Sequence, residues 1–235
     1  MNRPPPAKKK TAPAEVRVLI VDDHPFLRLG LAGALEAEPG FSVCAAVASA
    51  EEALTAVENL RPDVVVTDLN LPGKSGLELI KDLATLRPSL PVIALSMHAE
   101  EIYAERCLRA GARGYVMKDD GSEKLVEAIR QVLAGGTHVS PKIAARIIGN
   151  FGRRRDPQKQ SPIEQLTDRE FEVFQHIGAG RSTQEVADRL HLSPKTVETH
   201  RKHIKAKLQI ATVMELTSYA ARWIERDGAP ASGVS

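Results

Sequence analysis

The chain is predicted to fold as an α/β domain with a five-stranded, doubly wound parallel sheet, followed by a smaller all-α domain of four helices. Three observations predict this architecture. Short apolar runs alternate with amphipathic stretches up to residue 118, which is typical of buried parallel strands covered by helices. Only helical patterns follow that point. The length of 235 residues also exceeds what one ordinary hydrophobic core serves.

The five predicted strands are recognised by their β-branched and mostly apolar composition. They span Val16–Val21, Phe41–Val47, Asp63–Thr67, Pro91–Ser96 and Gly114–Lys118. Strands that are covered on both faces need few polar side chains, so this composition favours a central parallel sheet.

Capping residues mark the helix starts between these strands. Ser49 with Glu52 and Ser75 with Glu78 form Ser-x-x-Glu capping boxes, which satisfy the first amide groups of a helix. Paired glycines at 135 and 136 end the last helix of the α/β domain. Ser140, followed by proline, opens a further short helix through residue 148.

Changes in composition divide the chain into segments. The first residues are rich in Pro and Lys, and the segment 149–162 combines Gly, Pro and charge without periodicity. We read the three arginines at 153–155 as solvated linker charge, with contact to DNA phosphates as the alternative. The expected segments are a disordered arm (1–14), the α/β domain (15–136), a helix and flexible linker (137–162), the helical domain (163–226) and a disordered tail (227–235).

The overall composition excludes several classes of protein. With 43% hydrophobic and 26% charged residues, the chain is typical of a soluble globular protein. Cys44 and Cys107 follow no zinc or disulfide pattern, which fits a reducing compartment. No secretion signal and no run of about 18 apolar residues is present, so we expect a cytoplasmic protein without membrane contact. The formal charge of +2 is too small to indicate a nucleic-acid partner, so a basic signal must be local.

Polar residues gather where the predicted strands end. Asp22 and Asp23 follow the first strand, Asp68 the third, Ser96 closes the fourth and Lys118 the fifth. The carboxyl ends of parallel strands share one edge, where ligands bind in α/β sheets. Three converging carboxylates repel one another, and their hard oxygen ligands indicate a Mg²⁺ site.

Asp68 is the best candidate for a nucleophile in this pocket. It is followed by a turn-forming Leu-Pro-Gly segment, and attack on a phosphoryl donor would yield an aspartyl phosphate. Lys118 would pair with the phosphoryl oxygens and Ser96 would donate a hydrogen bond to one of them.

The motifs V-D-D-H-P, T-D-L-N-L-P-G-K-S-G, A-L-S and G-Y-V-M-K resemble those of bacterial response-regulator receiver domains, whose fold is flavodoxin-like, over roughly Val16 to Gly135. The resemblance implies that Asp23, Asp68 and the backbone carbonyl of Asn70 ligate Mg²⁺, with Asp22 acting through water. It implies that Ser96 and Tyr115 form a switch pair. It also places Asn70 and His98 beside the path of the hydrolytic water.

A second class of protein shares part of this chemistry. A haloacid-dehalogenase-like phosphatase also uses a strand-end Asp and Mg²⁺, but it requires a second carboxylate two residues further on as general acid. This chain has Asn70 there. We therefore expect no enzyme beyond self-phosphorylation from small donors and slow self-hydrolysis.

The segment Leu166 to Leu208 predicts a helix-turn-helix. Capping boxes begin its first two helices at Thr167 and Ser182, and Ser193-Pro194 begins the third. The segment resembles the DNA-binding domain of NarL/FixJ (LuxR-type) regulators over its whole length. That resemblance implies a sensor histidine kinase as partner, double-stranded DNA as ligand, and a homodimer when phosphorylated.

The third helix is the expected recognition helix. Val197, Ile204 and Leu208 recur on one face and are expected to pack inward. Lys202 is suited to guanine, Glu198 to cytosine and the Thr199 methyl to thymine. Lys195 and Lys205 are suited to phosphates. The complete expected DNA-binding set is Lys195, Thr196, Glu198, Thr199, Arg201, Lys202 and Lys205.

The fourth helix carries an apolar stripe, formed by Val213, Leu216, Ala220 and Ile224. A domain of about 60 residues cannot easily bury such a face, so we expect it to form part of a dimer contact. Closure of the small core by the same stripe is the alternative. A protein partner in place of DNA for this domain also stays open.

Overall fold

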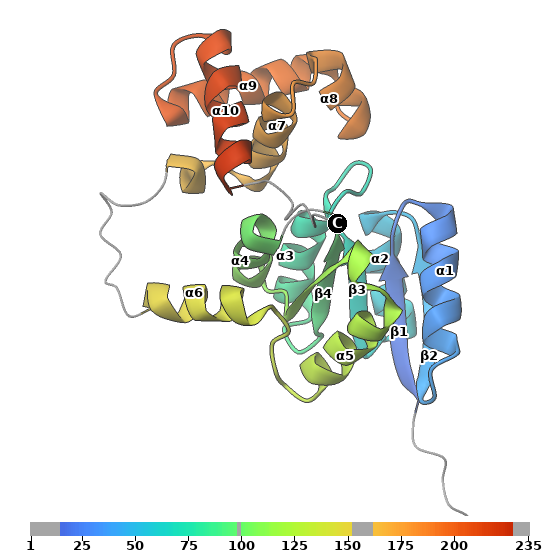
Figure 1. Cartoon of the computed structure of the whole chain (residues 1–235). Coiled ribbons are helices and arrows are strands. Elements are labelled where there is room, and N and C mark those ends of the chain that lie inside the picture. Colours follow the sequence, from blue (N-terminus) through green and yellow to red (C-terminus); the bar gives the residue numbers. More distant parts are fainter. Residues whose placement is uncertain (1–14, 98–99, 152–161, 228–235) are drawn as a thin grey trace, which may run out of the picture.

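The computed structural model describes residues 15–97, 100–151 and 162–227, which form two units (Figure 1). The predicted N-terminal arm, the linker arginines 153–155 and His98 lie outside the described residues, as does nearly all of the predicted tail. None of the helices in the described ranges is long and apolar enough to span a bilayer.

The N-terminal unit is built on a five-stranded parallel sheet in the order β2-β1-β3-β4-β5. This confirms the predicted fold class, and each strand lies within one residue of its predicted bounds. The strands are β1 (Val16–Val21), β2 (Phe41–Val47), β3 (Val64–Asp68), β4 (Val92–Ser96) and β5 (Gly114–Met117).

Helices cover both faces of this sheet. Helices α1 (Pro25–Glu36) and α5 (Ser122–Leu133) pack on one face, around Val18, Ile20 and Ile129. The other face is covered by α2 (Ala50–Leu60), α3 (Gly76–Leu86) and α4 (Glu100–Ala110). Strand order reverses between β1 and β3, so the loops that leave these two strands diverge and open a crevice at their carboxyl ends.

The chain adds two features to the sheet after α5. His138 pairs with the free edge of β5, accepting a hydrogen bond from the Tyr115 amide at 2.9 Å and donating one to the Arg113 carbonyl at 2.9 Å. Helix α6 (Pro141–Phe151) then packs against α4, and the Ser140 amide at its start donates to Glu100 at 2.6 Å. The α4–β5 side of the domain is therefore covered by this segment.

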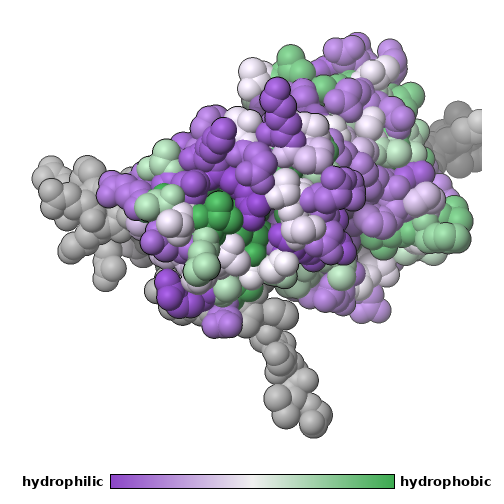
Figure 2. Space-filling view, turned by 90° about the horizontal axis from the view of Figure 1, so that it is seen from above, coloured by the Kyte–Doolittle hydropathy of each residue, from purple (hydrophilic) through white to green (hydrophobic). Residues whose placement is uncertain are grey.

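The C-terminal unit contains a 3-10 turn and four helices. They are the turn Pro162–Gln165, α7 (Asp168–Gly178), α8 (Thr183–Arg189), α9 (Pro194–Leu208) and α10 (Val213–Asp227). Phe171, Phe174 and Trp223 join α7 to α10 through ring contacts of 5.5 and 5.7 Å. Seen from above, the molecule is mainly hydrophilic (Figure 2).

Candidate functional site

The strand-end polar residues form an acidic pocket in the crevice. The Lys118 ammonium lies 2.7 Å from Asp68 Oδ2 and 2.8 Å from Asp22 Oδ2. Asp22 and Asp68 are almost completely buried, at 1% and 2% exposure. A lysine between two buried carboxylates balances only part of their charge, so the pocket remains a strong site for a further cation.

Burial governs the ionisation of this cluster. It raises the pKa of Asp68, Lys118 opposes the rise, and Asp22 adds to it. Burial lowers the pKa of Lys118, but the attraction of Asp68 and Asp22 outweighs burial and raises the pKa above its ordinary value. Lys118 is thus held in its charged form beside the proposed acceptor oxygen.

The donor set fits a hard divalent cation. Ligand atoms of Asp22, Asp23, His24 and Asp68 lie within 4.8 Å of one another. Asp23 Oδ1 is buried and accepts no hydrogen bond from the described residues, although the His24 imidazole lies 2.7 Å away. A buried carboxylate oxygen without a donor is costly unless a cation satisfies it, and carboxylate oxygens are the ligands that Mg²⁺ prefers.

The loop after β3 is shaped around Asp68. The amide of Asn70 donates to Asp68 Oδ1 at 3.2 Å, which fixes the carboxylate's orientation. Helix α3 starts so close to this loop that a Cβ at Gly76 would lie 1.8 Å from the Asp68 carbonyl oxygen. The glycine is required there because any side chain would push the loop away from the pocket.

Ser96 and Tyr115 stand at the ends of β4 and β5 next to the pocket. Ser96 is fully buried and Tyr115 is 2% exposed, and their side chains are hydrogen-bonded to each other. Burial raises the pKa of Tyr115, so its hydroxyl stays protonated. The structure thus brings together the two residues that we expected to form a switch pair.

Besides the acidic pocket, the structure shows a contact between the two units, made by α4 of the first unit. The sequence did not indicate this contact. The Tyr103 hydroxyl donates to Gln175 Oε1 of α7 at 2.5 Å. Arg106 Nη1 donates to the Leu166 carbonyl and to Asp168 Oδ1, each at 3.1 Å, and Nη2 donates to the Ile163 carbonyl at 2.9 Å.

Further contacts extend this interface. The Tyr103 ring packs edge-on against Phe171, with 5.5 Å between centroids. Lys81 of α3 forms an ion pair with Asp168. We call this set the α4–α7 interface: Lys81, Tyr103 and Arg106 on the first unit, and Asp168, Phe171 and Gln175 on the second. No short motif marks these residues, because the partners lie more than 50 positions apart.

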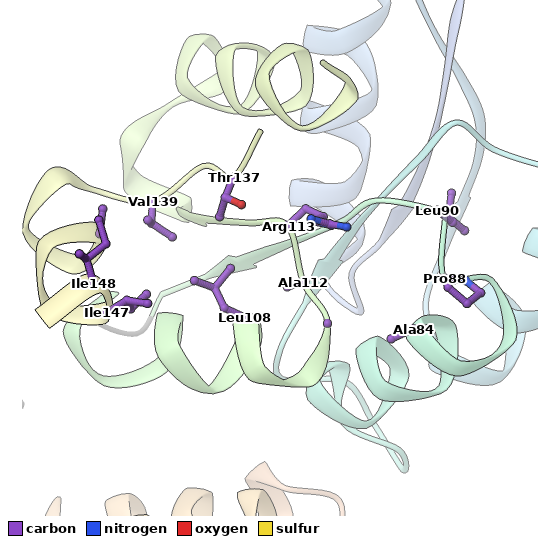
Figure 3. A pocket seen from close by; sticks show the side chains of 12 residues that line it. Ala84, Pro88, Leu90, Leu108, Ala112, Arg113, Thr137, Val139, Ile147 and Ile148 are labelled. Carbon is purple, nitrogen blue, oxygen red and sulfur yellow. The ribbon is translucent and has the colours of Figure 1, made fainter. Parts of the chain in front are cut away.

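A separate hollow of about 510 Å³ lies between the ends of α3 and α4, the segment 137–139 and α6 (Figure 3). Its walls are mostly apolar, with Leu90, Leu108, Val139 and Ile147 among the lining side chains. Among the described residues that line it, Arg113 is the one charged residue and none is acidic. It therefore lacks the carboxylates of the acidic pocket.

The expected recognition helix is α9, and its outward face is open to solvent. Val197 and Ile204 are fully buried, as expected, and Leu208 is partly buried. Among the seven expected DNA-binding residues, Lys195, Glu198, Thr199 and Lys202 are exposed, whereas Thr196, Arg201 and Lys205 are half-buried. The α4–α7 interface leaves this face uncovered because it engages α7.

Several of these residues have partners inside the domain. Glu198 Oε1 accepts hydrogen bonds from the Thr183 hydroxyl at 2.7 Å and from Arg201 at 3.1 Å. Thr196 lies 2.8 Å from the Ser193 hydroxyl, oxygen to oxygen, at the start of α9. Arg201 and Thr196 thus hold the helix in place, and one Glu198 oxygen is already in use.

The stripe on α10 is largely internal. Leu216 and Ala220 are fully buried, and a Cβ at Gly178 of α7 would lie 2.7 Å from the Ala220 backbone and 2.6 Å from Ile224. The expectation that so small a domain leaves this face free for a dimer is wrong for Leu216 and Ala220, because Gly178 lets α10 approach α7 closely. Val213, 45% exposed, keeps an outward position.

The fold, the acidic pocket and the exposed recognition helix α9 define a two-domain, DNA-binding response regulator. Residues 18–130 match the family described as response regulator receiver domain, and residues 164–220 match bacterial regulatory proteins of the luxR family. The chain belongs to the NarL/FixJ family of response regulators. This is a family of regulators, not of metabolic enzymes.

Two curated relatives show the extent of the likeness. Response regulator GacA of Pseudomonas protegens is 38% identical over 207 residues, which cover 88% of this chain and 96% of that protein. Oxygen regulatory protein NreC of Staphylococcus carnosus is 33% identical over 211 residues, which cover 88% and 97%. RcsB of Salmonella enterica, solved bound to the promoter rprA with the phosphomimetic BeF3-, is 26% identical with a TM-score of 0.60, covering 88% and 98%.

Proposed function

We propose that this chain passes a phosphoryl signal from a sensor histidine kinase to DNA, with Asp68 as the acceptor and transcription as the output. The observation that carries the proposal is the placement of Asp68, buried at the end of β3 and 2.7 Å from Lys118, in a chain that also presents an open α9. The two family matches support the same pairing of input and output.

The acceptor step is a phosphoryl transfer. One oxygen of Asp68 forms a bond to phosphorus while the N–P bond of the kinase phosphohistidine breaks, and the departing imidazole takes up a proton. Lys118 then pairs with the phosphoryl oxygens. Asp22, Asp23, Asp68 and the Asn70 carbonyl would hold Mg²⁺, which would lower the charge repulsion that the donor meets.

The buried pair Ser96 and Tyr115 supplies the link from this step to α4. A phosphoryl oxygen competes with Tyr115 for the Ser96 hydroxyl, so the Ser96–Tyr115 hydrogen bond breaks and the ring is released. Tyr115 lies close to α4: it adds to the rise in the pKa of Tyr103, and Cys107 adds to the rise in the pKa of Tyr115. Movement of Tyr115 therefore disturbs the helix that carries the α4–α7 interface, and we propose that phosphorylation weakens this interface.

The output is sequence-specific DNA binding by a dimer. Lys202, Thr199 and Glu198 would contact base edges, while Lys195 and Lys205 would contact phosphates. The RcsB structures, one of which holds two dimers on two parallel DNAs, support a dimeric arrangement for this chain. Two symmetric recognition helices require inverted half-sites.

The test combines phosphorylation with selection of DNA. The full chain is incubated with acetyl phosphate and Mg²⁺, its phosphoryl content is measured by intact mass, and bound sequences are selected from random DNA in both states. We expect one phosphoryl group, none on Asp68→Asn, and enrichment of an inverted repeat by the phosphorylated form. Labelling of Asp68→Asn would contradict the acceptor assignment. Absence of enrichment in both states would favour a protein partner for the C-terminal unit.

A further inference from the structure

The hollow beside α6 is apolar along most of its length. Figure 3 shows Ile147 and Ile148 of α6 at one end, Leu108 of α4 in the middle, and Leu90 with Pro88 at the other end. Its volume of about 510 Å³ lies within the range of about 300–1,000 Å³ that is typical of small-molecule sites. The hollow therefore has room for an elongated organic molecule.

The backbone shapes the wall where α3 and α4 end. Gly111, which follows α4, has a φ of +114°, a conformation that residues with a side chain rarely adopt. A Cβ at this position would lie 2.5 Å from the Cβ of Ala84 on α3, so the two helix ends meet without a side chain between them. Glycine thus keeps this wall of the hollow smooth.

Helix α6 forms the opposite wall and leaves part of its apolar side uncovered. Ile143 is fully buried, and Arg146 lies 3.8 Å from Glu105 of α4, so the start of α6 is held against the receiver. Further along the helix, Ile147 is half-buried and Ile148 is 71% exposed. Large apolar side chains that stay exposed beside an apolar hollow are typical of a binding surface.

Arg113 and Thr137 supply polar groups to the same hollow. They are neighbours because the amide of His138, the residue after Thr137, donates to the Arg113 carbonyl at 2.9 Å. The Arg113 guanidinium forms no hydrogen bond or ion pair with any residue that the structure describes, and none of the described lining residues is acidic. The planar fork of an arginine matches a carboxylate, and the Thr137 hydroxyl can donate a further hydrogen bond.

We infer that this hollow binds a monocarboxylic acid with an apolar alkyl chain of medium length. The carboxylate lies at Arg113 and Thr137, and the alkyl chain lies over Leu108, Val139 and Ile147. A single arginine balances the single charge of a carboxylate, whereas a phosphate would keep part of its charge. The apolar walls disfavour a ligand with a polar body, since its groups would find no hydrogen-bond partners there. The inference concerns the unphosphorylated protein and does not depend on the acidic pocket.

Binding would connect α4 to α6. Leu108 belongs to α4 and Ile147 to α6, so an alkyl chain between them contacts both helices. A ligand that binds only when the two helices are in place stabilises that arrangement. We therefore expect slower amide hydrogen exchange at the end of α4 and along α6 when the site is filled.

Isothermal titration of the full protein with hexanoate, octanoate and decanoate tests the ligand class. We expect saturable binding that strengthens with alkyl length, at least tenfold weaker binding of octan-1-ol than of octanoate, and no binding of acetate. If octan-1-ol binds as tightly as octanoate, the carboxylate is not recognised and the inference is wrong. If none of the three acids binds, the inference is also wrong, and an apolar protein segment is the better occupant.

Variants test the position of the ligand. Arg113→Gln should raise the dissociation constant of octanoate at least tenfold, and Ala144→Phe, which fills the hollow from α6, should do the same. Arg109→Gln removes an exposed arginine that does not line the hollow and should leave the constant unchanged. Circular dichroism checks that each variant is folded, and hydrogen exchange of wild type with and without octanoate locates the site without any substitution. Equal affinity of Arg113→Gln and wild type, or protection that falls outside α4, α6 and the segment 111–139, would overturn the inference.

Discussion

The guanidinium carbon of Arg106 lies 4.0 Å from the ring centroid of Phe171, which places a receiver side chain over an aromatic residue of the DNA-binding domain. The same guanidinium donates to two backbone carbonyls and to Asp168. A cation over an aromatic face contributes about 0.5–2 kcal/mol, and charged hydrogen bonds contribute more. Arg106 is therefore the residue on which the domain contact depends most.

Arg106→Ala should loosen the α4–α7 interface. We expect the docked population to fall at least tenfold, because the carbonyls of Ile163 and Leu166 and the Asp168 carboxylate lose their donor. Trp223, the single tryptophan, contacts Phe171 at 5.5 Å and reports the change through its emission. Small-angle scattering should show a larger radius of gyration. Arg109→Ala, which removes a helix-surface pair with Glu105, is the matched control, and an identical response of both variants would contradict this role.

Lys118→Ala should destabilise the receiver by about 3–5 kcal/mol without Mg²⁺, because Asp22 and Asp68 would be left as buried charges without their partner. Mg²⁺ should restore part of the loss by supplying positive charge to the same carboxylates. Urea unfolding in EDTA and in Mg²⁺ measures both effects. Lys124→Ala, which breaks only an exposed pair with Glu127, should show neither effect. A Mg²⁺ response equal to that of Lys124→Ala would mean that the carboxylates do not bind the cation.

The strand-end residues could be predicted from the sequence because their position follows from local signals. A β-branched run ending in Asp68 or Ser96 fixes the strand, and parallel strands bring their ends to one edge. The orientation of the recognition helix was predictable for a similar reason, since Val197 and Ile204 recur at helical spacing and are buried.

The domain contact could not be predicted in this way. Arg106 and Asp168 are 62 positions apart, and each reads as an ordinary surface charge on an amphipathic helix. Leu216 and Ala220 of the α10 stripe were misassigned for a related reason. Their helical spacing shows that they share an apolar face, but only the close approach at Gly178 shows what covers it. Local periodicity identifies the face that is buried, and tertiary packing decides its partner.

Glu172 should make the stability of the protein depend on pH. Burial raises its pKa from an ordinary value near 4.5 to about 7, and Arg169, 2.7 Å away, only partly offsets this. Because the folded state holds the proton more tightly than the unfolded state, the stability that this group contributes is present below about pH 4.5 and is lost as the pH rises through about 7.

Glu172→Gln should therefore make the free energy of unfolding less dependent on pH. At pH 8 the variant should be more stable than wild type by about 3 kcal/mol. Urea unfolding between pH 5 and about pH 8 provides the measurement. The exposed Glu225→Gln should follow the wild-type curve. A wild-type curve that does not fall relative to Glu172→Gln in this interval would show that Glu172 is ionised throughout.

Two lysines of α9 should separate specificity from general affinity. Lys202 is exposed and free to reach a base edge, whereas Lys205 is half-buried and its ammonium lies 3.4 Å from the Ala211 carbonyl at the helix end, a position suited to a phosphate. Lys202→Ala should lose about 1–3 kcal/mol at one base pair of each half-site and tolerate other bases there. Lys205→Ala should weaken binding to every sequence alike and reduce the slope of log affinity against log salt by about one unit. Binding isotherms on matched and singly substituted sites, at several salt concentrations, distinguish the two. If Lys202→Ala weakens binding to all DNA sites equally, Lys202 contacts the DNA backbone. In that case the bases are recognised by Thr199 and the free oxygen of Glu198.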